Sequence, residues 1–314
     1  MVKMFKIRPL FAERIWGGTR LKEKFGFAVD VDPCGEAWLI ADIPLGTNWV
    51  EEAQMSIHDF YEKYRTTYFG IKESGFPLRA TILDPGADLS IQLHPTDEYA
   101  LKHENSLGKP EAWYVMETVP GGKIYFGHKA QSKAEFIEKA NNDQWDELLD
   151  YVIAEEEKFL FVDAGVLHAV GKDVICFEVS RSSDVTYRVY DYKRIDQKTG
   201  LPRQLHMQQA FDNIKAPANE VGLIKPEEHW DKGVGVIEYH NVPGQFIFRR
   251  LRCREQGTYQ QREFGFYVVG RGSGIFNGRP VKLGETYFVA QNSGDLQLSG
   301  DFDLLMVSFS DKLD

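Results

Sequence analysis

Four side chains that can bind a metal ion lie in the first half of the chain, on short apolar segments typical of β-strands. Gln92 and His94 lie in "SIQLHP", Glu111 opens "EAWYV", and His168 lies in "DAGVLHAVG". Two neutral histidines and one carboxylate are a common ligand set for a divalent ion that keeps a position open for substrate. Gln92 would add a neutral oxygen ligand. The chemistry that these residues predict is that of a catalytic metal.

The spacing of Gln92 and His94 determines where they point if their segment is a strand. Successive side chains of a strand alternate between its faces, so these two residues share one face. Taken singly, each candidate has an ordinary interpretation: a hydrogen-bonded strand histidine, a solvated glutamate at a strand edge, or a histidine in a turn. The other histidines have no comparable setting and are interpreted as bystanders: His58, His103, His128, His206, His229 and His240. The four candidates together favour a metal site inside a barrel.

Short strands dominate the elements that must position these residues. β-Branched and aromatic runs alternate with Gly, Pro and Asp, as in "LRATILDP", "KIYFGH", "KFLFVDAG" and "DVICFEVS". Apolar residues at helical spacing predict one long helix in "SKAEFIEKANNDQWDELLDYVIAEEE", with Ser132 and Glu135 as a capping box. Shorter helices are predicted in "SIHDFYEKYR" and "QLHMQQAFDNIK". The predicted fold class is mainly β, with helices inserted into the scaffold or packed beside it.

A segment rich in proline and charge, residues 215–235, predicts a linker. Evenly spaced strands with glycine turns follow it, as in an antiparallel sandwich or barrel. We therefore expect a catalytic domain over residues 1–234 and a smaller C-terminal β domain over residues 235–314. The chain has no histidine after His240, so we expect no metal ligands in the second domain.

The overall composition limits the partners of the chain. The formal net charge is −10, which argues against nucleic acid or an anionic membrane surface as the main partner. Cys34, Cys176 and Cys253 are far apart and form no CxxC pair, so a reducing cytoplasm fits better than a disulfide framework. The N-terminal residues carry scattered charges, and no signal peptide or membrane-spanning run is predicted.

The order of the motifs is similar to that of a known family. The segments "QLHPTDEYA", "GKPEAWYV", "FVDAGVLHAVG" and "SRSSDVTYRVYDY", with "FAERIWGGTRL" and "GEAWLIADIP" before them, closely resemble the type I mannose-6-phosphate isomerases in their short bacterial form. This resemblance implies a cupin, or jelly-roll, catalytic barrel with a second, cupin-like β domain. It also implies one zinc ion per chain, held by Gln92, His94, Glu111 and His168.

The same resemblance implies an active-site arginine at Arg188, in "TYRVYDY", and an active-site lysine at Lys109, in "GKPE". Either cation could face a substrate phosphate, and Arg188 could instead act near the reacting carbons. Asp184 shares the face of Arg188 if their strand is regular, and it is a candidate base or orienting group. From the residues alone, Arg188 could equally be a surface cation paired with Asp184 or Asp191, and Lys109 a solvated side chain.

The function that the resemblance implies is interconversion of mannose 6-phosphate and fructose 6-phosphate by proton transfer through a cis-enediolate. A divalent ion suits this reaction because it polarises the carbonyl and stabilises the developing oxyanion. Two alternatives remain open: a metal-dependent cupin oxygenase and a sugar-phosphate-binding homologue without turnover. The expected partner is a small-molecule sugar phosphate, and the expected state is a monomer or weak homodimer in the cytoplasm.

Overall fold

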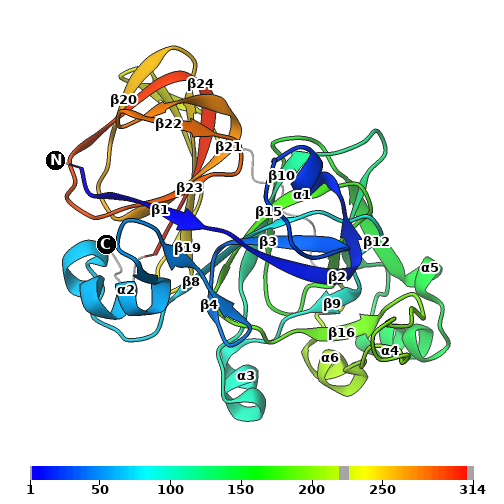
Figure 1. Cartoon of the computed structure of the whole chain (residues 1–314). Coiled ribbons are helices and arrows are strands. Elements are labelled where there is room, and N and C mark those ends of the chain that lie inside the picture. Colours follow the sequence, from blue (N-terminus) through cyan, green and yellow to red (C-terminus); the bar gives the residue numbers. More distant parts are fainter. Residues whose placement is uncertain (1, 219–225, 310–314) are drawn as a thin grey trace.

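The computed structural model describes residues 2–218 and 226–309, which form two β-barrels side by side (Figure 1). Two antiparallel sheets build the first barrel. The six-stranded sheet has the order β13 (Phe159–Val162), β10 (Glu111–Glu117), β15 (Ile175–Arg181), β8 (Leu78–Leu83), β3 (Cys34–Ile40), β2 (Leu10–Gly18). The five-stranded sheet has the order β12 (Leu149–Ile153), β11 (Lys123–His128), β14 (His168–Val170), β9 (Ile91–Leu93), β16 (Tyr187–Tyr190). The mainly β fold class is confirmed.

The second barrel is built from one larger sheet, which also includes the start of the chain. Its path is β17 (His229–Asp231), β18 (Val234–Val242), β19 (Phe246–Cys253), β24 (Asp295–Ser308), β21 (Gly265–Phe276), β23 (Thr286–Val289), β1 (Met4–Arg8), β6 (Trp49–Val50), β7 (Met55–Ser56). Off this path, β20 (Gln256–Gln260) pairs with β24 and β22 (Arg279–Lys282) pairs with β21. A separate hairpin joins β4 (Asp42–Ile43) to β5 (Gly46–Thr47).

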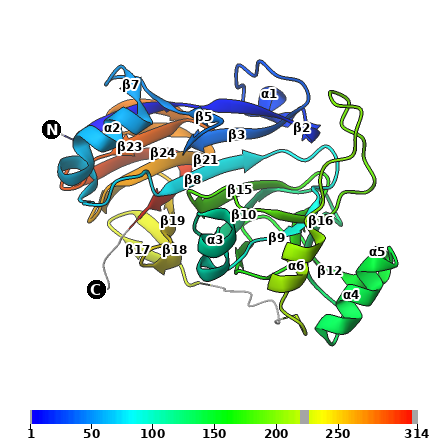
Figure 2. The same cartoon turned by 90° about the horizontal axis from the view of Figure 1, so that it is seen from below.

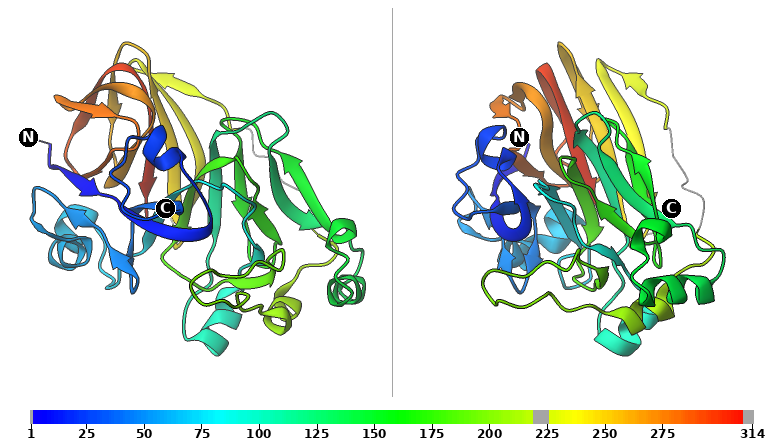
Figure 3. Two further views of the ribbon diagram at one scale, coloured as in Figure 1. Left: turned by 45° about the vertical axis from the view of Figure 1, so that its right-hand side comes forward. Right: turned by 90° about the vertical axis from the view of Figure 1, so that its right-hand side faces the viewer.

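The N-terminal strand β1 pairs with β23, so the start of the chain lies within the second barrel (Figures 1 and 3). The sheet that holds residues 229–308 therefore also contains residues 4–8 and 49–56. The division of the chain into domains 1–234 and 235–314 remains a prediction. Residues 219–225 of the predicted linker lie outside the described residues.

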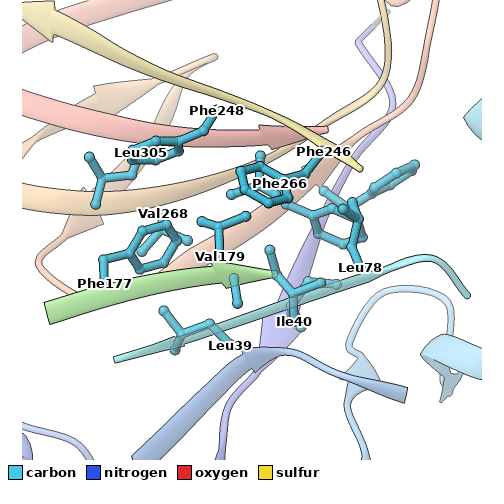
Figure 4. Close-up of a cluster of buried hydrophobic side chains, with 14 of the residues drawn as sticks. Leu39, Ile40, Leu78, Phe177, Val179, Phe246, Phe248, Phe266, Val268 and Leu305 are labelled. Atoms are coloured by element: carbon cyan, nitrogen blue, oxygen red, sulfur yellow. The ribbon is translucent and has the colours of Figure 1, made fainter. Parts of the chain in front are cut away.

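The six-stranded sheet uses its two faces differently, as alternation along a strand requires. On β15, Phe177 and Val179 pack into a core between the barrels, whereas Glu178 lines a cavity inside the first barrel. On β10, Tyr114 belongs to the core between the barrels and Trp113 to the core within the first barrel. Figure 4 shows the core between the barrels, which contains Leu39, Ile40, Leu78, Phe177 and Val179 together with Phe246, Phe248, Phe266, Val268 and Leu305. The second barrel therefore supports the back of the sheet whose front face bears Glu178.

Replacing Leu305 with alanine is expected to lower the free energy of unfolding by about 2 to 5 kcal/mol, because it leaves a cavity in this core. Leu305 is fully buried, whereas Leu101 is 55% exposed and provides a matched control. Leu101→Ala should change stability by only about 0.5 kcal/mol or less. Denaturant unfolding measures both variants, and equal losses would contradict the role assigned to this core.

Most helices cluster on one side of the first barrel, while α2 lies against the second (Figures 1 and 2). They are α1 (Arg20–Glu23), α2 (Ile57–Tyr64), a π-helical turn η1 (Arg65–Phe69), α3 (Asp97–Glu104), α4 (Lys133–Asn141), α5 (Trp145–Leu148) and α6 (Met207–Asn213). The short helices predicted at α2 and α6 are confirmed. Helix α3 was not predicted.

The long helix predicted from residue 132 is wrong in its second half. Ser132 caps α4 as expected, since its hydroxyl accepts the N–H of Glu135 at 3.2 Å. Asp143 then adopts a left-handed conformation with φ of 60°, which ends the helix. After the single turn of α5, the chain becomes β12 and pairs with β11. Pairing with the free edge of β11 satisfies backbone groups that a continued helix would leave unpaired.

All three cysteines are buried and free. Within residues 2–218 and 226–309, no helix is both long enough and apolar enough to cross a membrane.

Candidate metal centre and active site

The structure brings together three of the four predicted metal ligands. Glu111 begins β10 of the six-stranded sheet, while His168 begins β14 and His94 directly follows β9 of the five-stranded sheet. One ligand atom from each residue lies within 4.8 Å of the other two. All three side chains are at most 1% exposed. The cluster is therefore buried, with ligands supplied by both sheets.

Both imidazoles present an unprotonated nitrogen to Glu111. The Nδ1 of His94 lies 2.8 Å from the carbonyl of Val185, and the Nδ1 of His168 lies 2.9 Å from the carbonyl of Val166. A carbonyl only accepts hydrogen bonds, so each Nδ1 carries the proton of its neutral ring. Burial lowers the pKa of His168 to about 3, which keeps that ring neutral. The Nε2 atoms are then left as acceptors.

Three of the atoms that face one another in this cluster have no hydrogen-bond donor among the described residues. The Nε2 of His94 lies 3.2 Å from Oε2 of Glu111, and the Nε2 of His168 lies 3.4 Å from Oε1. Both Nε2 atoms and this Oε1 are buried without a hydrogen-bond partner. Buried acceptors that face one another are unfavourable unless a cation lies between them. The donor set of two imidazoles and a carboxylate fits a divalent metal.

Gln92 lies on β9, where its Cα partners are His168 on one side and Arg188 on the other. The hydroxyl of Ser90 donates to Oε1 of Gln92 at 3.4 Å. Gln92 lines the cavity next to the cluster. Its place beside His168 suits a fourth ligand, and that role remains a prediction.

A cavity of about 520 Å³ adjoins the cluster. Its wall includes the predicted residues Gln92, Lys109, Asp184 and Arg188, together with Glu36, Arg79, Ser90, Glu178, Arg203 and His206. A larger cavity, of about 850 Å³, lies between the start of the chain and the β22–β23 turn and contains none of the predicted site residues. Size alone therefore does not identify the active site, whereas the chemistry of the lining residues does.

Lys109 is buried and is not the solvated side chain that was one interpretation of the sequence. Its ammonium donates to Oε2 of Glu111 at 2.6 Å and to Oε1 of Glu178 at 3.1 Å. Burial opposes the charge of Lys109, but the two carboxylates outweigh it and raise its pKa. Lys109 also holds the pKa of Glu111 well below its usual range, again against the effect of burial. The lysine thus links the metal cluster to a second carboxylate.

Glu178, the second carboxylate, was not predicted from the sequence. It lies on β15, and the indole N–H of Trp113 donates to its Oε2 at 3.4 Å. Burial and the nearby charge of Glu111 raise the pKa of Glu178. A single acidic residue inside the apolar run "ICFEVS" was the only available signal.

Arg188 forms no ion pair with a carboxylate of residues 2–218 or 226–309, contrary to the surface-cation interpretation. Its Nε donates to the hydroxyl of Ser90 at 3.1 Å, and its Nη1 donates to the carbonyl of Gln204 at 3.1 Å. The two carboxylates considered for it bind other arginines: Asp184 binds Arg79, and Asp191 binds Arg194 and Arg203. Burial and the proximity of Arg203 lower the pKa of Arg188 to about 10. Arg188 is thus a cation in the cavity wall that has neutral partners.

Asp184 lines the cavity, but the reason given for placing it there was wrong. Strand β16 begins only at Tyr187, so Asp184 lies in the preceding loop and not on the strand of Arg188. Its carboxylate accepts from Arg79 at 2.5 Å and is half-exposed. Arg79 is itself buried on β8 and lies over the ring of Trp38. No pattern in the sequence indicates that this arginine is buried.

Comparisons with known proteins agree with this geometry. Residues 4–118 match the family model for the type I phosphomannose isomerase catalytic domain. The chain is 38% identical over 312 residues to the mannose-6-phosphate isomerase ManA of Bacillus subtilis, which covers 93% of this chain and 95% of ManA. It is 39% identical over 221 residues to the mannose-6-phosphate isomerase of Streptococcus mutans, which covers 67% of this chain and 70% of that protein.

Solved structures have the same fold. The crystal structure of mannose 6-phosphate isomerase from Bacillus subtilis matches with a TM-score of 0.92 at 30% identity, covering 98% of this chain and 99% of that one. A variant of phosphomannose isomerase from Salmonella typhimurium matches with a TM-score of 0.79 at 15% identity, covering 98% and 99%, and supports the fold alone. The resemblance stated from the motifs is therefore confirmed, and the chain belongs to the type I phosphomannose isomerase family.

Proposed function

We propose that this chain is a zinc-dependent isomerase that interconverts mannose 6-phosphate and fructose 6-phosphate. The observation that supports this most is the buried cluster of His94, Glu111 and His168, in which both imidazole Nε2 atoms and Oε1 of Glu111 have no donor among the described residues. The relatives named as mannose-6-phosphate isomerases support the choice of substrate. A coupled assay that reports fructose 6-phosphate formed from mannose 6-phosphate tests the proposal. No conversion by metal-loaded protein would overturn it.

One zinc ion per chain would be held by His94, Glu111 and His168, with Gln92 as the fourth ligand. When bound, the ion would polarise the substrate carbonyl and offset the negative charge that develops on its oxygen. Zinc suits nitrogen and carboxylate ligands and has no redox chemistry of its own. An oxygenase would instead need iron, so analysis of the bound metal separates these two functions.

The cation group around Arg188 is the proposed site of the substrate phosphate. Arg188 and Arg203 line the cavity, and Arg203 shares the carboxylate of Asp191 with Arg194. Arg188 has only neutral hydrogen-bond partners among the described residues, so its charge is available to a phosphate dianion. The side chain of Arg188 extends toward Ser90, away from His94 along β9. This direction favours the phosphate over the reacting carbons.

Glu178 and Lys109 are the proposed proton-transferring groups. An isomerase of this type must remove a proton from one carbon of the substrate and return a proton to its neighbour. Glu178 lines the cavity, is buried, and has a raised pKa, which makes its carboxylate a stronger base than an ordinary glutamate. Lys109 lies between Glu178 and Glu111 and can donate to oxygens that gain negative charge. Asp184 is half-exposed and bound by Arg79, so we propose it as an orienting group.

Arg188→Ala is expected to raise the KM for mannose 6-phosphate and to leave kcat nearly unchanged. A hydrogen bond to a charged group contributes about 1.5 to 3 kcal/mol, so kcat/KM should fall roughly 10- to 150-fold. A phosphate contact that is equal in the ground state and the transition state affects KM alone. Steady-state kinetics measure the split, and Arg188→Lys should recover part of the loss.

Metal content is the control for Arg188→Ala and should not change, because Arg188 is not a proposed ligand. A normal KM with a reduced kcat would contradict the phosphate assignment and place Arg188 at the reacting carbons. Near-normal values of both would remove Arg188 from the site altogether.

We also propose that residues 235–314 are a β domain without metal ligands. The three free, buried cysteines fit a protein of the reducing cytoplasm. A monomer or weak homodimer remains the expected state.

A further inference from the structure

We infer that Arg181 is a positioning residue. Its side chain holds two segments next to the metal-site residues, at Asp97 and Gly108, and connects them to the second barrel at Gly244. This inference rests on the proposed function of the cluster around Glu111. Arg181 is the last residue of β15, and its side chain is 12% exposed. Among the described residues, no hydrogen bond or ion pair joins it to the metal cluster or to a residue of the cavity wall, so it would act through the backbone that it holds.

Arg181 makes contacts with three separate segments. Its Nε and Nη2 donate to the carbonyl of Gly108 at 3.2 and 2.7 Å. Its guanidinium also forms an ion pair with both carboxylate oxygens of Asp97, one of them at 3.2 Å from Nη1. Its Nη1 donates to the carbonyl of Gly244 at 3.4 Å. One side chain therefore joins the start of α3, the loop before β10 and the turn between β18 and β19.

The first two of these segments are directly next to the proposed site. Asp97 is the third residue after His94, and Gly108 immediately precedes Lys109 and lies three residues before Glu111. The N–H of Gly108 donates to Oδ1 of Asp97 at 2.9 Å, so the two segments are also joined directly. From Asp97 and Gly108, the two residues that Arg181 contacts, His94, Lys109 and Glu111 are at most three residues away along the chain. If the carbonyl of Gly108 moved, Lys109 and Glu111 would therefore move as well, because they lie only one and three residues further along the chain.

Gly108 shows how closely these segments approach. A Cβ atom at this position would lie 2.5 Å from the carbonyl oxygen of Pro95, a distance that no real side chain tolerates. The absence of a side chain is therefore a condition for the contact between the loop before β10 and the segment after His94. Two neighbouring bonds hold the same loop: the hydroxyl of Ser183 donates to the carbonyl of Leu107 at 2.8 Å, and the N–H of Arg181 donates to the carbonyl of Pro110 at 3.3 Å.

The third segment connects the site to the second barrel. Gly244 lies in the turn between β18 and β19, and those strands contribute Tyr239, Phe246 and Phe248 to the core between the barrels. The turn is therefore anchored by this core on one side and contacts Arg181 on the other. The second barrel would thus support the geometry of the metal site as well as the back of the six-stranded sheet.

The test compares Arg181→Gln with Arg249→Gln in the metal-loaded enzyme. Arg249 is a matched control, because its side chain is 13% exposed and pairs with Glu238 and Glu263, all within the second barrel. Groups that orient metal ligands typically change metal affinity by about 10- to 100-fold when they are removed. We expect Arg181→Gln to release metal to a chelator about tenfold faster or more, with a lower kcat and a nearly unchanged KM. Arg249→Gln should show wild-type metal release and kcat, even if its melting temperature falls as far as that of Arg181→Gln.

Asp97→Asn is the second variant, because it removes the carboxylate that pairs with Arg181 and leaves Arg181 itself unchanged. It should accelerate metal release in the same direction, and the double variant should be no worse than the more severe single one. Wild-type metal release in Arg181→Gln would overturn the inference, as would parallel losses in Arg181→Gln and Arg249→Gln. Metal release needs no substrate, so this outcome is independent of whether mannose 6-phosphate is converted.

Discussion

Replacing His94 with alanine is expected to abolish both metal binding and isomerase activity. His94 supplies one of two imidazole nitrogens that face Glu111 without a donor. Removing it leaves an incomplete ligand set and a buried carboxylate with less compensation. Loss of a metal that stabilises transition-state charge costs several kcal/mol, or at least about a thousandfold in kcat/KM. Metal analysis of the purified variant and the coupled assay measure the two effects.

His58→Ala is the matched control for His94→Ala. His58 is an exposed histidine on α2 whose Nδ1 lies 2.8 Å from a carboxylate oxygen of Asp42, outside the cavity. It should retain the metal content and the activity of the wild type. Full activity in His94→Ala would rule out the proposed metal mechanism, whatever the metal content of that variant.

Glu178→Gln is expected to lower kcat by about 10²- to 10⁴-fold while KM stays close to the wild-type value. General base catalysis contributes an effect of this size, and an amide cannot accept the proton. The glutamine has the same shape, and its one amide oxygen can still accept the hydrogen bond from Lys109. Only the longer contact with Trp113, at 3.4 Å, then loses its acceptor, so the fold should be kept. Steady-state kinetics with mannose 6-phosphate measure the change. Asp184→Asn should lower kcat clearly less than Glu178→Gln does. A larger loss of kcat in Asp184→Asn would instead indicate that Asp184 is the base.

The pH profile of the wild type provides an independent check on Glu178. Burial and Glu111 raise the pKa of Glu178, and a base acts only when it is ionised. Activity should therefore be lost as the pH falls through this raised pKa, which lies above the value of about 4.3 that is usual for glutamate. An acid limb at or below the usual value would contradict the assignment of Glu178 as the base.

Local patterns were sufficient to predict the residues of the candidate metal cluster. Strand alternation placed Gln92 and His94 on one face, and the motif order added Glu111 and His168. Three of these residues meet in one buried cluster because the two sheets of the barrel face each other. The resemblance also identified Lys109 and Arg188, which line the neighbouring cavity.

Features that depend on distant contacts could not be predicted in the same way. A lone glutamate in an apolar strand, such as Glu178, becomes informative only when Lys109 is placed beside it from another strand. Residues 149–153 have the apolar spacing of a helix, but pairing with β11 outweighs this spacing and makes them strand β12. Strand β1 joins the second barrel through β23, a partner almost the whole chain away. Helix α3 was missed because only Ala100 is buried along it, which leaves no apolar periodicity to detect.

The most direct test of the central claim is removal and return of the metal in the wild-type protein. Purified protein should carry about one zinc-type ion per chain, as expected for a single open site. Equilibration with a strong chelator should abolish the conversion of mannose 6-phosphate to fructose 6-phosphate, and added zinc should restore it. Full isomerase activity in protein shown to be free of metal would contradict the proposed mechanism.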